Sequence, residues 1–183
     1  RRVLFRSSKK SLFMVTDAPN QNILRWKEDI YKSNGAIRKN IQTGHHTPEE
    51  WDSVLFQILY IVYVLKCKKI NIDKITLEDN FYIKETKTNE KEMGYWSYKV
   101  GSVQYYVPNY GNIVMFDSNF NNIIKIPDNL NIECTDDISG YDINELLKPL
   151  DINELLTPIG RNLQIKNKFS ELFLSNFSKY LHD

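Results

Sequence analysis

The sequence predicts an α+β fold with a mainly helical body and a small β-hairpin region. Three observations lead to this prediction. The chain contains one long helical segment with a clear start, a pair of alternating strands joined by a two-residue turn, and an apolar strand on either side of that pair. Of its 183 residues, 42% are hydrophobic, which is enough to build the core of one globular domain.

Short elements precede the long helix. Residues 11–16 (SLFMVT) read as a buried strand, and the Asp-Ala-Pro-Asn run that follows breaks it. Residues 22–31 then place Ile23, Trp26 and Ile30 at helical spacing. We therefore expect a second element, a helix, before the long one.

The long helix has the clearest local signal in the chain. The side chain of Thr47 can accept hydrogen bonds from the first turn, Pro48 suits the first helical position, and Glu50 completes a capping box. We expect the helix to continue to about Lys66. Its apolar positions form a wide face, which predicts deep burial for Trp51, Val54, Leu55, Ile58, Ile61, Val62 and Leu65.

Strands dominate the middle of the chain. Residues 71–80 are expected to form an irregular loop, and residues 81–84 a short strand. Residues 96–100 and 103–107 alternate around a Gly-Ser pair, which predicts a hairpin with a two-residue turn. Residues 113–116 form another buried strand, which an acidic residue follows directly.

The last third contains a tandem repeat, DINELLKP at 142–149 and DINELLTP at 151–158. Two copies are too few for a solenoid, so we predict short helical turns capped by Asp142 and Asp151. Residues 169–181 have the apolar spacing of an amphipathic helix. Because no Gly/Ser-rich linker interrupts the chain, we predict a single domain.

The composition limits the classes of function. Lys and Arg number 24 and Asp and Glu number 23, so the net charge of +1 gives no electrostatic case for nucleic acid or an anionic membrane. The most apolar run, 54–65, is far shorter than the about 20 residues that span a bilayer. Cys67 and Cys134 are too few for a disulfide framework and are expected to be inert thiols. We expect a soluble intracellular protein.

Two groups of residues that invite a functional interpretation have simpler ones. His45 and His46 are adjacent, so they do not face one metal site easily and are expected in a surface loop. Tyr105, Tyr106 and Tyr110 could stack on bases, but no basic groove accompanies them. Packing within the hairpin is the preferred interpretation.

Four segments together carry a resemblance to a known family. They read MVTDAPNQNILRW, IRKNIQTGHHTPEEWDSVLFQILYIVYVL, ITLEDNFYIK and WSYKVGSVQYYVPNYGNIVMFDSNF. Their order resembles a protein kinase from its hinge strand onward. More specifically, it resembles a family of kinase-like and pseudokinase-like proteins encoded by large double-stranded DNA viruses of protists.

The resemblance covers residues 12–124 of a unit that we assign to 8–183. It implies a protein-kinase-like C-lobe, with the N-lobe largely missing. Residues 1–7 (RRVLFRS) resemble a translated sequencing adapter and are left out of this fold prediction.

The resemblance also implies a site. Thr16, Asp17 and Ala18 would lie in the hinge, whose backbone meets the adenine of ATP in a working kinase. Asn80 fits the loop asparagine that holds one Mg²⁺, and Asp117 fits the aspartate that holds the other.

Departures from the kinase pattern argue against catalysis. Ile75 stands five residues before Asn80, where a kinase carries its base, and its side chain cannot accept a proton. Asp73 could serve as the base only after a rearrangement of the loop. Asp117 is followed by Ser-Asn and not by Phe-Gly. Because losing a base or a metal ligand costs several kcal/mol of barrier, we expect a catalytically degenerate interaction or regulatory module of a viral protein, in the host cytoplasm or the virion.

Two other functions stay open. The chain can belong to a divergent, active Ser/Thr kinase with Asp73 as the base, ATP and Mg²⁺ as cofactors and a protein as substrate. It can instead be a structural, virion-associated protein without a nucleotide cleft. In each of these cases the expected partner is a protein, and neither nucleic acid nor a membrane.

Overall fold

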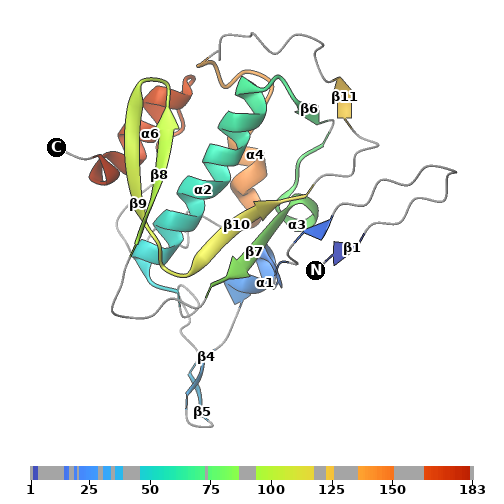
Figure 1. Cartoon of the computed structure of the whole chain (residues 1–183), viewed down its shortest axis with the longest axis vertical. Helices are drawn as coiled ribbons and strands as arrows, with labels where there is room; N and C mark the ends of the chain where they lie inside the picture. The colour runs from blue at the N-terminus through green and yellow to red at the C-terminus, as the bar shows by residue number, and fades with distance from the viewer. Residues whose placement is uncertain are drawn as a thin grey trace, which may run out of the picture.

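The protein has an α+β fold in which helices and small sheets share one hydrophobic core (Figure 1). The computed structural model describes residues 2–3, 15–16, 19, 21–28, 31–33, 36–38, 46–72, 74–86, 94–117, 123–125, 136–150 and 163–181. All structural statements below concern these residues.

The helices are α1 (Ile23–Glu28), α2 (Pro48–Cys67), α3 (Leu77–Asn80), α4 (Ile143–Leu147) and α6 (Phe169–Phe177). Two 3₁₀ turns continue α4 and α6, namely η2 (Lys148–Leu150) and η3 (Ser178–Tyr180). The strands are β1 (Arg2–Val3), β2 (Val15–Thr16), β3 (Gln21–Asn22), β4 (Tyr31–Ser33), β5 (Ala36–Arg38), β6 (Asn71–Ile72), β7 (Phe81–Glu85), β8 (Tyr95–Val100), β9 (Val103–Pro108), β10 (Asn112–Phe116) and β11 (Ile123–Lys125).

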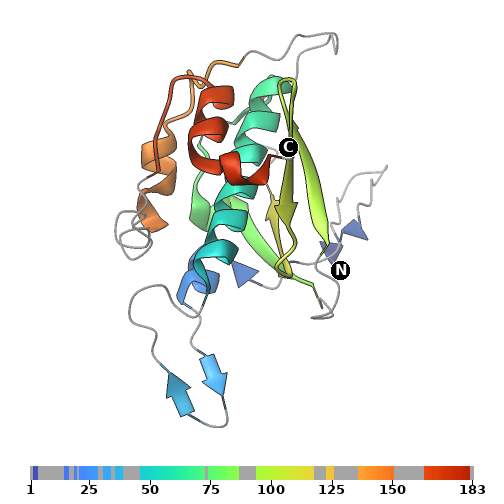
Figure 2. The same cartoon turned by 90° about the vertical axis from the view of Figure 1, so that its left-hand side faces the viewer.

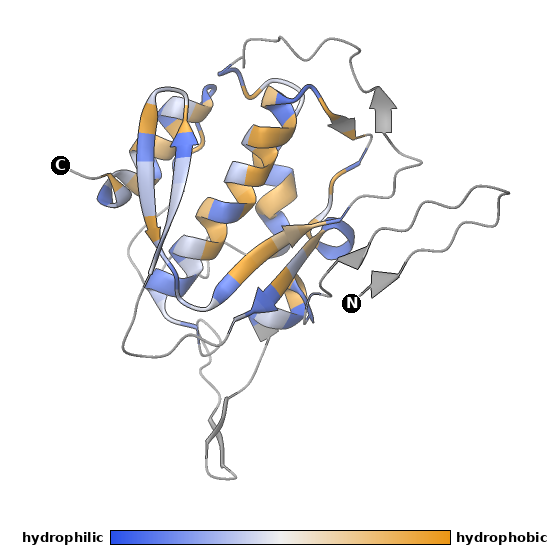
Figure 3. Cartoon of the chain, in the orientation of Figure 1, coloured by the Kyte–Doolittle hydropathy of each residue, from blue (hydrophilic) through white to orange (hydrophobic). Residues whose placement is uncertain are grey.

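Helix α2 is the centre of the fold, with the other elements arranged around it (Figure 1). Its predicted start is confirmed, because the Thr47 hydroxyl accepts from the Glu50 amide at 3.2 Å and the Glu50 carboxylate accepts from the Thr47 amide at 2.7 Å. Its deep burial is confirmed as well. Twelve of its residues are buried, and the hydropathy colouring in Figure 3 follows apolar side chains along the helix.

The predicted strands on either side of the hairpin pair with each other. β7 lies between β10 and β3 in a three-stranded antiparallel sheet, with Phe116 opposite Phe81 at one end and Asn112 opposite Glu85 at the other. A second, two-stranded sheet joins β6 to β11, with Ile123 opposite Ile72. The sequence did not predict β6 or β11 as strands.

The open edge of β10 is completed by a side chain of α2. The Gln57 amide donates to the carbonyl oxygen of Asn112 at 3.1 Å and accepts from the amide of Val114 at 2.9 Å. Gln57 is 4% exposed, so its side chain replaces the hydrogen bonds of a further strand. This explains why a glutamine interrupts an otherwise apolar stretch of the helix.

The predicted hairpin is present as β8 and β9, with Gly101 at φ +59° in its two-residue turn. Such a φ favours glycine. The inner side of the hairpin meets α2 and α6 in an aromatic cluster, where Phe56 lies 5.5 Å from Tyr105 and 4.9 Å from Phe173 between ring centroids. Tyr105 is therefore a core residue, as expected, whereas Tyr106 is 38% exposed. Figure 2 shows this hairpin alongside α2.

Two predicted boundaries differ from the structure. The loop expected at 71–80 contains β6 and the short helix α3, whose N-cap is Thr76. The helix expected at 22–31 is shorter, because α1 ends at Glu28 and Tyr31 begins β4. The structure also shortens the last helix, since α6 gives way to η3 after Phe177.

The first copy of the repeat docks in the core. Asp142 caps α4 as predicted, accepting from the Glu145 amide at 3.0 Å. The apolar side chains of this copy are buried, namely Ile143, Leu146, Leu147 and Leu150. The second copy, including Asp151, lies outside the described residues.

His46 corrects the expectation of a surface loop. Its ring is only 8% exposed and stacks on Trp26, with ring centroids 3.7 Å apart. Its Nε2 lies 2.8 Å from the carbonyl oxygen of Trp26, and its Nδ1 lies 3.8 Å from the carboxylate of Glu50. The histidine thus joins α1 to the start of α2, while His45 lies outside the described residues.

Cys67 corrects another expectation. It is disulfide-bonded and not an inert thiol, and Cys134 lies outside the described residues. Among the helices described, none is both long and apolar enough to cross a bilayer.

Candidate functional site

The two predicted metal ligands, Asn80 and Asp117, lie side by side at one end of the β7–β10 ladder. Asn80 comes directly before β7 and Asp117 directly after β10, and the two strands pair antiparallel. Two hydrogen bonds of 2.9 Å join the residues. The Asp117 amide donates to the Asn80 carbonyl oxygen, and the Asn80 Nδ2 donates to the Asp117 carbonyl oxygen. The predicted convergence of positions 80 and 117 is therefore confirmed.

The Asn80 side chain also shapes the loop that precedes it. Its Oδ1 accepts from the Thr76 amide at 2.9 Å, and the side chain is buried, with 7% exposure. Thr76 in turn caps α3, because its hydroxyl accepts from the Asp79 amide at 3.1 Å. One buried amide therefore closes the turn from 76 to 80 and attaches it to the end of β10.

These contacts decide what Asn80 can offer to a cation. Both atoms of its amide group already have backbone partners, and Oδ1 keeps one lone pair. The half-buried Asp117 carboxylate is a suitable oxygen ligand for Mg²⁺ by chemical type. No group of three or more His, Cys, Asp or Glu side chains with metal-binding geometry occurs in the part of the chain that the structure describes. The first role that the geometry supports for Asn80 is to hold the backbone.

The structure describes only part of the remaining predicted site. Thr16 lies in β2, which pairs with β1 through Arg2 opposite Thr16. This pairing brings a part of the segment that resembles an adapter next to the predicted hinge. Asp17, Ala18 and Asp73 lie outside the described residues.

The chain segments that enter and leave the site also meet. β6 leads into the loop that ends at Asn80, and β11 follows Asp117, and these two strands pair antiparallel. The loop of 73–80 and the segment after Asp117 therefore both start and end at paired strands. Tyr141 supports the entry to β6, because its hydroxyl donates to the Ile70 carbonyl oxygen at 2.9 Å.

A cavity of about 490 Å³ borders the loop before Asn80. The loop contributes Ile72, Lys74, Ile75, Thr76 and Leu77, and the opposite wall comes from residues 140–142 and from the α4–η2 unit. Tyr141 stands in this wall, and burial raises the pKa of its phenol. The cavity is thus the depression beside the predicted catalytic-loop region.

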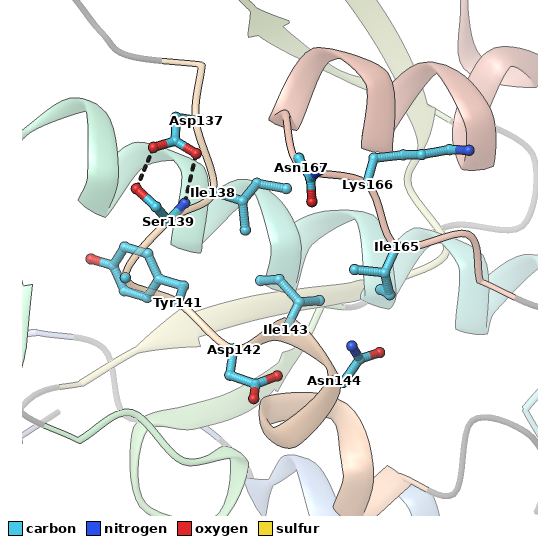
Figure 4. Close-up of a pocket in the computed structure, with 11 residues that line it drawn as sticks. Asp137, Ile138, Ser139, Tyr141, Asp142, Ile143, Asn144, Ile165, Lys166 and Asn167 are labelled. Carbon is cyan, nitrogen blue, oxygen red and sulfur yellow. Dashed lines mark hydrogen bonds between the residues drawn. The ribbon is translucent and has the colours of Figure 1, made fainter.

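A larger depression of about 600 Å³ lies on the other side of Tyr141, between residues 137–144 and 165–167 (Figure 4). The Ser139 hydroxyl and amide both donate to the Asp137 carboxylate, which holds the pKa of that carboxyl below its usual value. This depression contains neither Asn80 nor Asp117. Despite its size, we do not assign the candidate site to it.

Sequence reasoning missed two residues that build this region. Thr76 begins a Thr-Leu-Glu-Asp run, which resembles a helix N-terminus and was a usable signal for α3. Gln57 had no such signal, because its partners on β10 are 55 and 57 positions away in the sequence.

Comparisons with known proteins show one relationship. Over 105 residues, the chain is 37% identical to an uncharacterized protein of Acanthamoeba polyphaga mimivirus. The matched stretch is 57% of this chain but only 14% of the mimivirus protein, so the chain is related to a small part of a much longer giant-virus protein. No protein-family model matches the sequence, and no solved structure matches it either.

Proposed function

We propose that this chain is a kinase-like domain of a giant-virus protein that has lost phosphoryl transfer and serves as a protein-interaction or regulatory module. The observation that carries the proposal is the junction between Asn80 and Asp117. A loop asparagine before one strand and an aspartate after its antiparallel partner is the arrangement in which kinases present their metal ligands. The relationship to a mimivirus protein supports the viral part of the proposal.

The surroundings of the junction support the kinase-like part. The long helix α2 packs against β10, and β6 and β11 pair beside the loop that ends at Asn80. A loop held at both of its ends and at its centre provides a rigid platform next to the 490 Å³ cavity.

The loss of transfer follows from the residues of the loop. Ile75 occupies the position of the general base and is half-buried. The Asn80 Oδ1, which a kinase would direct at Mg²⁺, accepts from the Thr76 amide. A general base contributes about 10²–10⁴-fold to a rate. The proposed module therefore keeps the support of a kinase site without the group that removes the substrate proton.

A phosphoryl-transfer assay with labelled ATP and Mg²⁺ tests this proposal. The chain should transfer no label to itself or to a generic protein substrate above the level of the Asp117→Ala variant. The matched control is Glu78→Ala, because Glu78 is exposed on α3 and makes no contact with Asp117 among the described contacts. Transfer that Asp117→Ala abolishes and Glu78→Ala preserves would instead establish an active kinase, with Asp73 as the candidate base.

Thermal unfolding with and without Mg²⁺ and ATP separates the proposed module from a purely structural virion protein. A nucleotide at 100 times its Kd adds about 2.7 kcal/mol to the free energy of unfolding. Stabilisation that Asp117→Ala removes would support a kinase-like cleft. If even millimolar nucleotide left the melting temperature of the chain and of the longer viral protein unchanged, the structural alternative would replace our proposal.

A further inference from the structure

The β8–β9 hairpin carries an unusual share of the exposed apolar surface. Five large apolar side chains in the described part of the chain are exposed, and four of them belong to this hairpin: Tyr95 (62%), Trp96 (38%), Val103 (36%) and Tyr106 (38%). Exposed aromatic side chains that gather on one element are typical of an interaction surface.

One edge of this hairpin is open. β8 pairs with β9 along its whole length, and no other described strand lies beside β8. On the far side, β9 meets the end of the chain through a bridge between Tyr105 and Leu181. The open edge therefore belongs to β8, and an open, aromatic strand edge is a template for pairing with another strand.

The turn of the hairpin determines which groups this edge presents. Val100 and Val103 close the two-residue turn and form a hydrogen-bonded pair, and such pairs alternate along an antiparallel ladder. Trp96, Tyr98 and Val100 thus direct their backbone groups at β9. The N–H and C=O groups of Tyr95, Ser97 and Lys99 point to the open edge.

Three outward residues centred on Ser97 define one two-fold register. If a second β8 runs antiparallel beside the first, the register that uses all three residues sets Ser97 opposite its own copy. It also sets Tyr95 opposite Lys99 of the other copy, where an ammonium group and an exposed aromatic ring attract each other. On the other face, the same register sets Trp96 opposite Tyr98 of the other copy.

From this self-complementarity we infer that β8 is a dimerisation edge, and that two copies of the chain pair through antiparallel β8 strands about a two-fold axis at Ser97. The two hairpins then form one continuous four-stranded sheet. Lys99 of each copy covers Tyr95 of the other, and the half-exposed Trp96 rings become buried. This inference does not depend on the proposed kinase-like function.

Light scattering coupled to size-exclusion chromatography tests the association. The full chain should shift from the mass of one copy toward the mass of two as its concentration rises, with or without a reductant. Ser97→Pro should abolish the shift and leave the melting temperature unchanged, because the Ser97 N–H makes no bond to β9 and proline is tolerated at such an edge position. Tyr106→Ser is the matched control: it removes an exposed aromatic ring from β9, leaves the β8 edge intact, and should dimerise.

A cross-linking experiment tests the register itself. Hydrogen-bonded partners in an antiparallel ladder have Cα atoms about 5.5 Å apart, within the range of a disulfide. Ser97→Cys should therefore form a covalent dimer on mild oxidation, whereas Ser102→Cys, exposed in the turn of the same hairpin, should not. A wild-type chain that stays monomeric at every concentration, or a Ser97→Cys variant that cross-links no faster than Ser102→Cys, would overturn the inference.

Discussion

Asn80 and Asp117 hold each other through two backbone-directed hydrogen bonds of 2.9 Å across the end of the β7–β10 ladder. The pair joins the last residue of a loop to the first residue after a strand that lies 37 positions further along the chain. Because Asn80 also closes its own loop through Thr76, three chain segments depend on one buried amide group.

Replacing Asn80 with alanine should therefore lower the stability of the protein. The variant leaves the Thr76 amide and the Asp117 carbonyl without partners, and each buried polar group that loses its hydrogen bond costs about 1–3 kcal/mol. Urea denaturation of Asn80→Ala measures this loss. Glu78→Ala, an exposed change in the same short helix, should alter the free energy of unfolding by less than about 0.5 kcal/mol. Equal stabilities for the two variants would show that the Asn80 amide does not organise the loop.

Gln57 should be as sensitive to an apolar replacement. Gln57→Leu keeps most of the side-chain volume but removes the partner of the Val114 amide and of the Asn112 carbonyl. The same cost of about 1–3 kcal/mol for each unpaired group applies, and amide hydrogen exchange at Val114 should accelerate. Leu59→Met on the same helix provides a volume-conserving control, expected to cost less than about 1.5 kcal/mol. Unchanged exchange at Val114 in Gln57→Leu would contradict this account of the β10 edge.

Tyr98 should make stability decline at alkaline pH. Burial, and then the neighbouring Tyr60, raise the pKa of Tyr98 from 10.0 to about 12. Since the folded-state pKa lies above the unfolded one, the contribution of Tyr98 is fully present below pH 10 and is lost as the pH rises from 10 toward 12. A shift of this size corresponds to on the order of 1–3 kcal/mol, the lower end being appropriate for a side chain that keeps some solvent contact.

Chemical denaturation at a series of pH values measures this dependence. Tyr98→Phe should flatten the decline between pH 10 and 12, and Tyr95→Phe should not, because Tyr95 is 62% exposed. A decline of the same steepness in Tyr98→Phe would assign the effect to other groups.

The tandem repeat should make one deletion unusually well tolerated. Residues 151–159 (DINELLTPI) repeat residues 142–150 (DINELLKPL), including every apolar position that the first copy buries. Deleting 142–150 brings the second copy to the same distance from Tyr141, so the melting temperature should stay close to that of the full chain. Losing buried leucines without replacement costs about 2–5 kcal/mol each.

The control for this deletion carries Leu155→Ser and Leu156→Ser in addition. These two changes remove the apolar side chains that would take the places of Leu146 and Leu147, so this variant should melt well below the simple deletion. If both variants lost the same stability, the second copy would be unable to replace the first.

Much of the fold could be predicted where the signal is local. The capping box at Thr47, the turn glycine at Gly101 and the cap at Asp142 each act within four residues, and all three are present as predicted. The burial of Trp26 and Trp51 followed from helical spacing alone. The burial of His46 could not be predicted in this way, because it depends on the ring of Trp26, twenty positions away.

The candidate site shows the same division. The positions of Asn80 and Asp117 relative to two strands were readable from the sequence, and the antiparallel pairing of those strands brings the two residues together. The use of the Asn80 amide was not readable, because Oδ1 bonds to one backbone group nearby and Nδ2 to another 37 positions away.

By itself, the sequence determined an α+β domain built on one capped, deeply buried helix, with an asparagine and an aspartate at the two ends of a strand pair. Spacing, capping and turn residues carry that information because they act between near neighbours. Only the tertiary structure decided that Gln57 completes the edge of β10, that His46 joins the core, and that β8 keeps an open edge. Those outcomes depend on which buried polar groups find partners after distant segments meet, and no local pattern encodes that.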